Sequence, residues 1–372
     1  MKSITILKSR FTGQGGAEKY ARCLAEAFFK KGCQVTVLTT DPVVGSFPFE
    51  IISTPLKSHT SVSKLWEFER FCEHYIQTHP TDCLFGHDRN RFQTHIRAGS
   101  GVHKSFLETR KHYEPAWKRW RHALNPLHTS LLHFEKTSFE HPDLEVLFTN
   151  SYLVKSQILA HYNVEEEKIH VVHNGVEWHK WQKSFDEWDT VYTPNRFDLL
   201  FLGSNFGRKG LLPLLKGLKA YGNKDIHLSV VGKDKQQKWY ENLVSKWGLT
   251  HQVTFYGSQD QITPFLQKAD ALAIPSYYDP FANVTVEALA MGLFVMSSTM
   301  NGGCEVLNEE TGCVIEDLNS PDDMKAALEK AVSKPKTKER AASIRQSVQH
   351  LDFSTQLQAY LDLCLSPTFA SA

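Results

Sequence analysis

The stretch "DLLFLGSNFGRKGLLPLLKGLKAY", residues 198–221, decides the fold class because it joins a strand, a glycine loop and a helix. The apolar run Asp198–Gly203 predicts a strand, and residues 211–221 have helical spacing. Between them, the loop Gly203–Gly210 carries the adjacent cations Arg208 and Lys209. Such a loop offers backbone N–H groups and the positive end of a helix dipole to a phosphate. The spacing is not that of a Walker loop, and a basic turn in solvent is the alternative.

The alternation of strand and helix extends to both sides of this stretch. "SITILKS" (residues 3–9), "AEKYARCLAEAFFKKG" (17–32) and "QVTVLTT" (34–40) predict a βαβ unit. The alternation of strand and helix continues to residue 170. The polar, Trp-rich segment 179–196 predicts a linker. A second series then runs from residue 198 to "FVMSS" (294–298). The sequence therefore predicts an α/β protein with two doubly wound domains and a cleft between them, where ligands bind beyond the carboxyl ends of strands.

Composition narrows the class of protein. The chain has 372 residues, with 42 Lys and Arg against 41 Asp and Glu, so no overall basic field would draw it to nucleic acid. Its seven cysteines lie at long spacings without a C-x-x-C motif, which favours reduced thiols in the cytosol over disulfides or a zinc knuckle. The first residues contain too short an apolar run for a signal peptide, and no run of 18 apolar residues occurs. We expect a cytoplasmic protein.

A second candidate site is "YYDPFANVTVEALAMG", residues 277–292. Asp279 would lie in the loop before a helix that begins near Asn283, and Glu287 about one turn inside that helix. Carboxylates placed in this way can accept hydrogen bonds from the hydroxyls of a ribose or hexose. The alternative is that Asp279 caps the helix and Glu287 is solvated. The surrounding segment is apolar nearly all round, so we expect Glu287 to be buried and to need partners.

Two weaker signals lie in the first half of the chain. "TGQGGAEK" (residues 12–19) places Gly13, Gly15 and Gly16 before the first helix, but its spacing is not the dinucleotide fingerprint. His103 follows a strand-like stretch and a glycine pair, so it could reach into a cleft. With 18 histidines in the chain, an ordinary structural role is the alternative.

Residues 104–121, "KSFLETRKHYEPAWKRWR", combine six Lys and Arg with two Glu and interleaved aromatic residues. A segment of this kind can lie on an anionic membrane surface. The alternative is a solvated helix with a Trp-packed inner face. The sequence contains no D-x-D, H-E-x-x-H, G-x-S-x-G or Cys/His cluster, so we expect neither a divalent-metal site nor a hydrolytic triad.

Over nearly its whole length, the chain resembles glycosyltransferase family 4, whose members are retaining, nucleotide-sugar-dependent enzymes of the GT-B fold. "DPFANVTVEALAMG" matches the family's E-x7-E motif, and "PLKSHTS" (55–61) with "GSNFGRKG" is most similar to the lipopolysaccharide core glucosyltransferases. "HNGVE" (173–177) resembles the crossing between domains. The resemblance implies domains at 1–173 and 174–352, with a C-terminal helix, 353–372, returning to the first.

The resemblance also implies residue roles. Arg208 and Lys209 would hold the donor diphosphate, Glu287 the ribose, and Asp279 and His103 would lie near the transferred sugar. Substrate contacts through backbone or glycine loops are implied for Phe281, Ala282, Asn283, Gly203, Gly15, Gly16, Gly302 and Gly303. Asp279 stands where the family commonly has Glu, and Ala282 where it often has Gly.

The implied function is transfer of a hexose, with retention and without a metal or other cofactor, onto a lipopolysaccharide-core or other lipid-linked glycan. UDP-glucose is the expected donor, and UDP-galactose, UDP-GlcNAc or GDP-mannose are alternatives. The enzyme would work at the inner face of the cytoplasmic membrane, touching lipid through residues 104–121. A nucleotide-sugar epimerase, a phosphorylase or a non-catalytic sugar-nucleotide binding protein are the competing interpretations.

Overall fold

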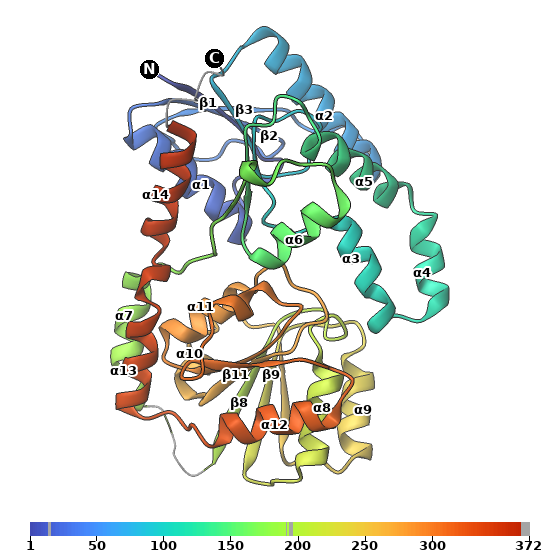
Figure 1. The fold of residues 1–372 in the computed structure, drawn as a ribbon, viewed down its shortest axis with the longest axis vertical. Coiled ribbons are helices and arrows are strands. Elements are labelled where there is room, and N and C mark those ends of the chain that lie inside the picture. Colours follow the sequence, from blue (N-terminus) through green and yellow to red (C-terminus); the bar gives the residue numbers. More distant parts are fainter. Residues whose placement is uncertain (14–15, 191, 193–195, 366–372) are drawn as a thin grey trace. The chain divides into compact units, whose positions relative to one another are not determined.

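The computed structural model describes residues 1–13, 16–190, 192 and 196–365, which group into two compact units. Unit 1 comprises residues 1–108, 115–172 and the residues after Phe353. Unit 2 comprises Thr109–Glu114 and His173–Phe353. Each unit is a parallel β-sheet with helices on its faces (Figure 1).

The sheet of unit 1 has seven strands in the order β3-β2-β1-β4-β5-β6-β7, all parallel to their neighbours. The strands are β1 (Ser3–Leu7), β2 (Gln34–Thr39), β3 (Glu50–Ser53), β4 (Cys83–Gly86), β5 (His95–Arg97), β6 (Val146–Thr149) and β7 (Ile169–Val171). The helices are α1 (Gly16–Lys30), α2 (Ser61–Thr78), α3 (His103–Thr109), α4 (Ala116–Ala123), α5 (Pro126–Phe139), α6 (Tyr152–His161) and α14 (Phe353–Leu365).

Unit 2 has six parallel strands in the order β10-β9-β8-β11-β12-β13. The strands are β8 (Phe197–Leu202), β9 (Ile226–Val231), β10 (Val253–Gly257), β11 (Ala271–Ile274), β12 (Phe294–Ser298) and β13 (Gly312–Ile315). The helices are α7 (Trp178–Asp186), α8 (Leu211–Tyr221), α9 (Gln237–Lys246), α10 (Thr263–Lys268), α11 (Asn283–Ala290), α12 (Pro321–Val332) and α13 (Lys338–Ser347).

Both sheets have the doubly wound topology that the sequence predicts. Within each unit the second and third strands lie on one side of the first, and the fourth and later strands lie on the other. The strand order reverses between β1 and β4 in unit 1 and between β8 and β11 in unit 2. Loops that follow the strands at such a reversal diverge, and the crevice beyond their carboxyl ends is where ligands bind in these folds.

Strand β8 shows why the sheets form. Phe197, Leu199 and Phe201 pack into one hydrophobic cluster with α8, α9 and α12. Leu200 and Leu202 point to the opposite face, into a cluster with α7, α10, α11 and α13. A strand buried on both faces needs a nearly continuous apolar run, which is what residues 197–202 provide. Burial of each large aliphatic side chain contributes about 1.5–3 kcal/mol.

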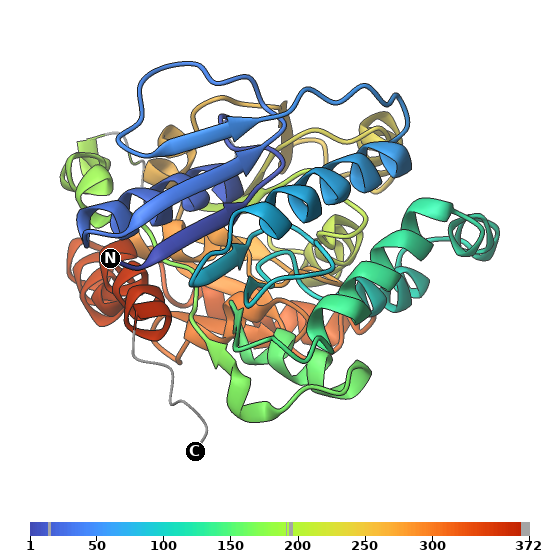
Figure 2. The same ribbon diagram turned by 90° about the horizontal axis from the view of Figure 1, so that it is seen from above.

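The C-terminal helix α14 belongs to unit 1, as the fold class predicted. The ring of Tyr360 lies 4.4 Å from that of Phe148 and 5.6 Å from that of Tyr20 on α1. Helices α1 and α14 therefore share one face of the unit 1 sheet, whereas Phe68 and Cys72 of α2 pack with Leu84 of β4 on the other (Figure 2).

The segment predicted as a linker, residues 179–196, lies partly outside the described residues, and its described part, 179–190, is largely helical. It contains most of α7, whose first residue, Trp178, is buried. The guanidinium of Arg345 lies 4.6 Å from the Trp178 ring and 4.7 Å from the Phe185 ring. The tryptophans of this region pack into a hydrophobic cluster of unit 2 and so fix the position of the short helix α7. Among the described residues, no helix is both long and apolar enough to span a membrane.

Candidate functional site

The candidate site of unit 2 lies where the strand order reverses. The glycine loop Gly203–Gly210 follows β8, and the loop 275–282 follows β11. Since β8 and β11 are adjacent and parallel, with Ala271 opposite Leu199, both loops leave the same edge of the sheet. The topology thus places two segments about 70 residues apart in the sequence against each other.

The glycine loop is fixed by close backbone contacts. Gly210 has φ +79°, and a Cβ there would lie 1.7 Å from the carbonyl oxygen of Pro275 in the facing loop. At Gly232, which follows β9, a Cβ would lie 2.0 Å from the carbonyl oxygen of Gly203. Phe206 N–H donates to Oδ2 of Asp234 over 2.7 Å. Only glycine permits both approaches, because a Cβ at Gly210 or Gly232 would clash with the facing backbone. The loops that follow β8, β9 and β11 can therefore pack closely against one another.

The two cations of the glycine loop converge on one carboxylate. Lys209 Nζ lies 2.5 Å and Arg208 Nη1 3.2 Å from Oδ2 of Asp279, and Arg208 Nη1 also donates to the carbonyl of Tyr278 over 2.6 Å. The three side chains are only 22%, 11% and 10% exposed for Arg208, Lys209 and Asp279. Two positive charges against one negative charge leave a partly desolvated net positive charge. That balance suits a bound anion.

The start of α11 is organised by a buried asparagine that sequence reasoning did not single out. The N–H groups of Ala282 and Gly303 each donate to Oδ1 of Asn301 over 3.1 Å. Gly302 N–H donates to the carbonyl of Asp279 over 3.0 Å, and Asp279 N–H donates to that of Met300 over 2.9 Å. These bonds join the Asp279 loop to the predicted Gly302–Gly303 loop. The asparagine could have been found from the pattern of a polar residue before two glycines at a strand end.

For the acidic motif, the structure excludes one alternative and differs from one expectation. Asp279 does not cap α11, since the N-cap is Ala282 and its side chain makes no capping bond. Glu287, which was expected to be buried, is half-buried. The side chains of Phe281 and Ala282 are buried, and Asn283 is exposed at the first position of the helix. Any contact of Phe281 and Ala282 with a ligand would therefore come from their backbone, as predicted.

In unit 1, the predicted glycine loop is only partly described. Gly15 lies outside the described residues, and Gly16 is the exposed first residue of α1. The preceding loop is held by Asp41, whose Oδ2 accepts from the N–H groups of Phe11 and Thr12, each over 2.8 Å. Arg22 Nη1 donates to the carbonyl of Gly13 over 2.7 Å. The backbone near the first helix is therefore firmly supported.

His103 is the buried first residue of α3 in unit 1. Its N–H donates to both carboxylate oxygens of the fully buried Glu135, over 3.0 and 2.8 Å. Its Nε2 lies 3.0 Å from Nδ1 of His128. These contacts anchor His103 within its own unit, and its role beside a donor sugar stays a prediction.

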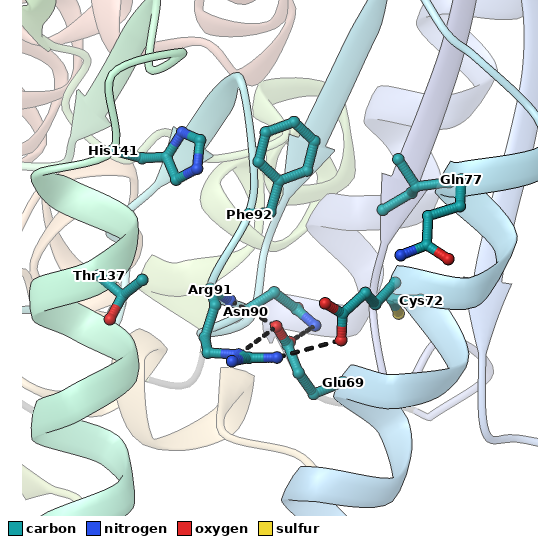
Figure 3. Close-up of a pocket in the computed structure, with 10 residues that line it drawn as sticks. Glu69, Cys72, Gln77, Asn90, Arg91, Phe92, Thr137 and His141 are labelled. Carbon is teal, nitrogen blue, oxygen red and sulfur yellow. Dashed lines mark hydrogen bonds and ion pairs between the residues drawn. The ribbon is translucent and has the colours of Figure 1, made fainter.

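Unit 1 also contains a cavity of about 360 Å³ that no sequence signal indicated (Figure 3). It lies between α2, the loop after β4 and α5. Glu69 accepts from Asn90 Nδ2 over 2.8 Å and from Arg91 Nε over 3.2 Å, and Figure 3 shows this network on one wall. The lining residues are Glu69, Cys72, Glu73, Ile76, Gln77, Asn90, Arg91, Phe92, Thr137 and His141. None of the predicted site residues lines it, so it is separate from the candidate site.

The basic, aromatic segment 104–121 contains parts of α3 and α4, between which Thr109–Glu114 groups with unit 2. Trp117 on α4 is 59% exposed, so at this position the expected Trp-packed inner face is not formed. Arg119 is also exposed, and the neighbouring Leu124 is 69% exposed. The exposed Trp117 and Arg119 lie on α4 and the exposed Leu124 just after it, and membrane contact through residues 104–121 stays a prediction.

Two doubly wound units with a cationic glycine loop facing an acidic helix start define a glycosyltransferase of the GT-B type. Residues 14–179 match the family model "Glycosyltransferase Family 4", and residues 183–347 match "Glycosyl transferases group 1". Together the two matches span nearly the whole chain. The chain belongs to the glycosyltransferases of this family, and it is a hexosyltransferase enzyme.

Among curated proteins, the chain is similar to lipopolysaccharide glucosyltransferase WaaG of Escherichia coli K12. The two are 24% identical over 333 residues, covering 86% of each chain. Among solved structures, WaaG superposes with a TM-score of 0.77 at 21% identity, covering 98% of this chain and 100% of WaaG. HepE of Anabaena, solved with UDP-glucose, superposes with a TM-score of 0.67 at 15% identity, covering 99% and 100%. Both structures share the fold.

Proposed function

We propose that the protein transfers glucose from UDP-glucose, with retention of anomeric configuration and without a metal ion, to a lipopolysaccharide-core or other lipid-linked glycan. The observation that carries the proposal is the convergence of Arg208 and Lys209 on Asp279 beside the glycine loop. The name of WaaG as a lipopolysaccharide glucosyltransferase and the UDP-glucose complex of HepE support the choice of donor and acceptor.

The proposed chemistry begins with the donor diphosphate. In its absence the two cations pair with Asp279, and a diphosphate beside the loop would take over as their partner. As the bond between the anomeric carbon and the phosphate oxygen breaks, negative charge grows on the leaving UDP. Preorganised cations and backbone N–H groups stabilise that charge most strongly where water is excluded. Arg208 and Lys209 would therefore supply the electrostatic role that a divalent cation has in other transferases.

Retention follows from attack on the face that the leaving group departs from. The acceptor hydroxyl oxygen forms a bond to the anomeric carbon while the leaving phosphate oxygen takes the hydroxyl proton. A covalent route needs a carboxylate nucleophile close to a second carboxyl group that acts as acid and base. Before a donor binds, Asp279 pairs with Arg208 and Lys209, and we propose attack without a covalent intermediate on Asp279. Its proposed role is to orient the two cations and to lie near the sugar.

The acceptor is proposed to be held at an anionic membrane surface. Trp117 on α4 and Leu124 just after it are exposed apolar side chains, and Arg119 of the same helix is exposed too. Interfacial helices combine apolar and cationic side chains. We propose peripheral contact through residues 104–121 at the inner face of the cytoplasmic membrane.

The decisive experiment is a panel of UDP-, GDP- and ADP-sugars, with binding measured by calorimetry and slow donor hydrolysis by proton NMR. We expect UDP-glucose to bind and to release glucose first as the α-anomer. Adding Mg²⁺ or Mn²⁺ should leave the rate unchanged. The proposal is wrong if no nucleotide sugar binds, or if the β-anomer is released first. Preference for another sugar would correct the donor and leave the transfer reaction standing.

A further inference from the structure

Three residues that are far apart in the sequence come together inside unit 1. Cys83 is the first residue of β4, His95 the first residue of β5, and Cys364 lies in the last turn of α14. Their two sulfur atoms and one ring nitrogen all lie within 4.8 Å of one another. All three side chains are buried, at 1%, 3% and 3% exposure. The three residues are 12 and 269 positions apart in the sequence, so a search for short motifs does not find this group.

The group forms because its members share one face of the sheet. Phe85, two residues after Cys83, points toward Tyr360 of α14, with ring centroids 6.2 Å apart. His95 is the register partner of Phe85 on the neighbouring strand, so its side chain leaves the same face. Cys364 follows Tyr360 by one helical turn and is buried with it. Two strands and one helix thus direct a thiol, an imidazole and a second thiol to one point.

The chemistry of this donor set is that of a soft or borderline metal. Thiolate and imidazole are the ligands that Zn²⁺ prefers, at about 2.3 and 2.0–2.1 Å, so ligand atoms around one tetrahedral ion lie roughly 3.5–3.8 Å apart. Because the three atoms already lie within 4.8 Å of one another, a contraction of at most about 1 Å brings them to that geometry. Thr94 Oγ1 lies 2.9 Å from Nδ1 of His95. This contact orients the imidazole ring, as a hydrogen bond to the nitrogen that does not bind the metal does in metal-bound histidines.

We propose that Cys83, His95 and Cys364 form a structural Zn²⁺ site that ties the C-terminal helix to the sheet of unit 1. Three protein ligands leave one coordination position for a water molecule. The site is at the first residues of β4 and β5, whereas substrates of doubly wound sheets bind beyond the carboxyl ends. The ion is therefore structural, and it is separate from the metal-independent transfer proposed above.

The ion would add to the polar contacts that hold the end of α14. Lys2 Nζ lies 3.4 and 3.3 Å from the carbonyls of Cys364 and Leu365, a second contact between the first strand region and the end of α14. A ligand that binds only the folded state stabilises it by mass action. Zn²⁺ should therefore raise the melting temperature of unit 1.

The test uses the full chain, reduced and stripped with EDTA, then titrated with Zn²⁺ or Co²⁺. We expect one Zn²⁺ per chain, a rise of several degrees in Tm, and a near-ultraviolet thiolate-to-cobalt charge-transfer band. Cys364→Ser and His95→Gln should weaken Zn²⁺ binding at least tenfold and abolish the rise in Tm. Cys72→Ser is the matched control, because Cys72 is equally buried but packs on the opposite face of the sheet.

The Co²⁺ spectrum of the unmodified protein keeps the test valid if a variant fails to fold. The proposal is overturned if the stripped protein binds no Zn²⁺, or if the Co²⁺ complex shows no thiolate band. It is also overturned if Cys364→Ser binds Zn²⁺ as the unmodified chain does. Isolation of a Cys83–Cys364 disulfide from protein purified under reducing conditions would equally exclude the metal.

Discussion

The strand order reverses in the same way in both units, but the loops at the reversal carry different charged side chains. In unit 1, Lys8 after β1 meets Asp88 after β4, with Nζ and Oδ1 2.6 Å apart. In unit 2, both Arg208 and Lys209 after β8 meet Asp279 after β11. One cation and one carboxylate balance each other, whereas two cations on one carboxylate do not. The topology therefore offers a possible ligand site at the reversal in each unit. The net positive charge of the loops indicates that the site in unit 2 suits a diphosphate.

The supporting framework is nearly the same in both units. An aspartate just beyond the second strand, Asp41 in unit 1 and Asp234 in unit 2, accepts backbone N–H groups from the loop after the first strand. The loop is therefore held rigidly in either case. The functional difference must come from the residues that the loops present, and the predictions below test that conclusion.

The largest expected effect is at Asp279. Asp279→Asn should lower kcat about 10²–10³-fold, the cost of losing a preorganised electrostatic contact at a reacting centre. The Kd for UDP should stay constant or fall, because the substitution removes the anion that competes for Arg208 and Lys209. Steady-state kinetics and calorimetry separate the two effects. Asp88→Asn is the matched change in unit 1, and it should leave UDP binding unaltered. A kcat close to that of the unmodified enzyme would contradict the assignment.

The second effect concerns the glycine loops. Gly210→Ala should lower the free energy of unfolding by about 3 kcal/mol or more, because the added Cβ meets the Pro275 carbonyl in a left-handed backbone conformation. Gly13→Ala in unit 1 should cost under about 1 kcal/mol, since its Cβ would meet only the flexible side chain of Glu18 at 3.1 Å. Urea unfolding of both variants measures the contrast. Equal costs would show that the unit 2 loop is not held by close contact.

The third prediction compares two buried lysines. Lys8 is paired with Asp88, whereas Lys336 places Nζ 3.3 Å from the carbonyls of Leu266 and Gln267 and 4.3 Å from the Trp188 ring. Burial lowers the pKa of Lys336 to about 7, and Asp270 offsets this only in part. Between pH 7 and about 10 the unfolded chain binds the proton that the folded chain has lost, so this group makes stability rise with pH.

Lys336→Met should therefore be more stable than the unmodified protein at pH 7, with an advantage that shrinks as pH rises. The slope attributable to this lysine is at most about 1.4 kcal/mol per pH unit. Thermal unfolding from pH 6 to pH 10 measures it, and the exposed Lys325→Met serves as the control. A pH-independent difference between the two proteins would refute the shifted pKa.

The smallest effect is at the surface. Trp117→Ala should weaken binding to vesicles of anionic phospholipid by about 1 kcal/mol, the scale of one interfacial apolar contact. Trp239 in unit 2 is 49% exposed but lies outside the basic segment, so Trp239→Ala should bind vesicles as the unmodified protein does. Sedimentation with vesicles gives both affinities. Equal losses in the two variants would indicate non-specific adsorption and remove the basis for membrane contact through residues 104–121.

Much of the fold could be predicted because it depends on local patterns. Strand β8, the glycine loop and α8 are adjacent in the sequence, and the apolar run of the strand is read directly from residues 197–202. The helix expected to begin near Asn283 does begin there, as α11. Residues 179–190 were predicted wrongly because the helical spacing of Trp178, Trp181 and Phe185, which pack on one hydrophobic cluster, was not recognised.

The unpredicted parts of the site depend on contacts between distant segments. Asn301 acts on Ala282, and Asp234 acts on Phe206, through bonds that become visible only when the loops are placed in space. Glu287 was expected to be buried because α11 is apolar, yet it is half-buried. The cysteine and histidine group at β4, β5 and α14 was missed because no spacing rule joins its members.

The central claim is that the reversal in unit 2, and not that in unit 1, holds the donor diphosphate. Calorimetric titration with UDP tests it most directly. Arg208→Ala and Lys209→Ala should each raise the Kd about 10–100-fold, the cost of one charge-assisted hydrogen bond. Lys8→Met should leave the Kd within about threefold of the unmodified protein. UDP binding that survives both unit 2 substitutions, or that is lost in Lys8→Met, would contradict the account.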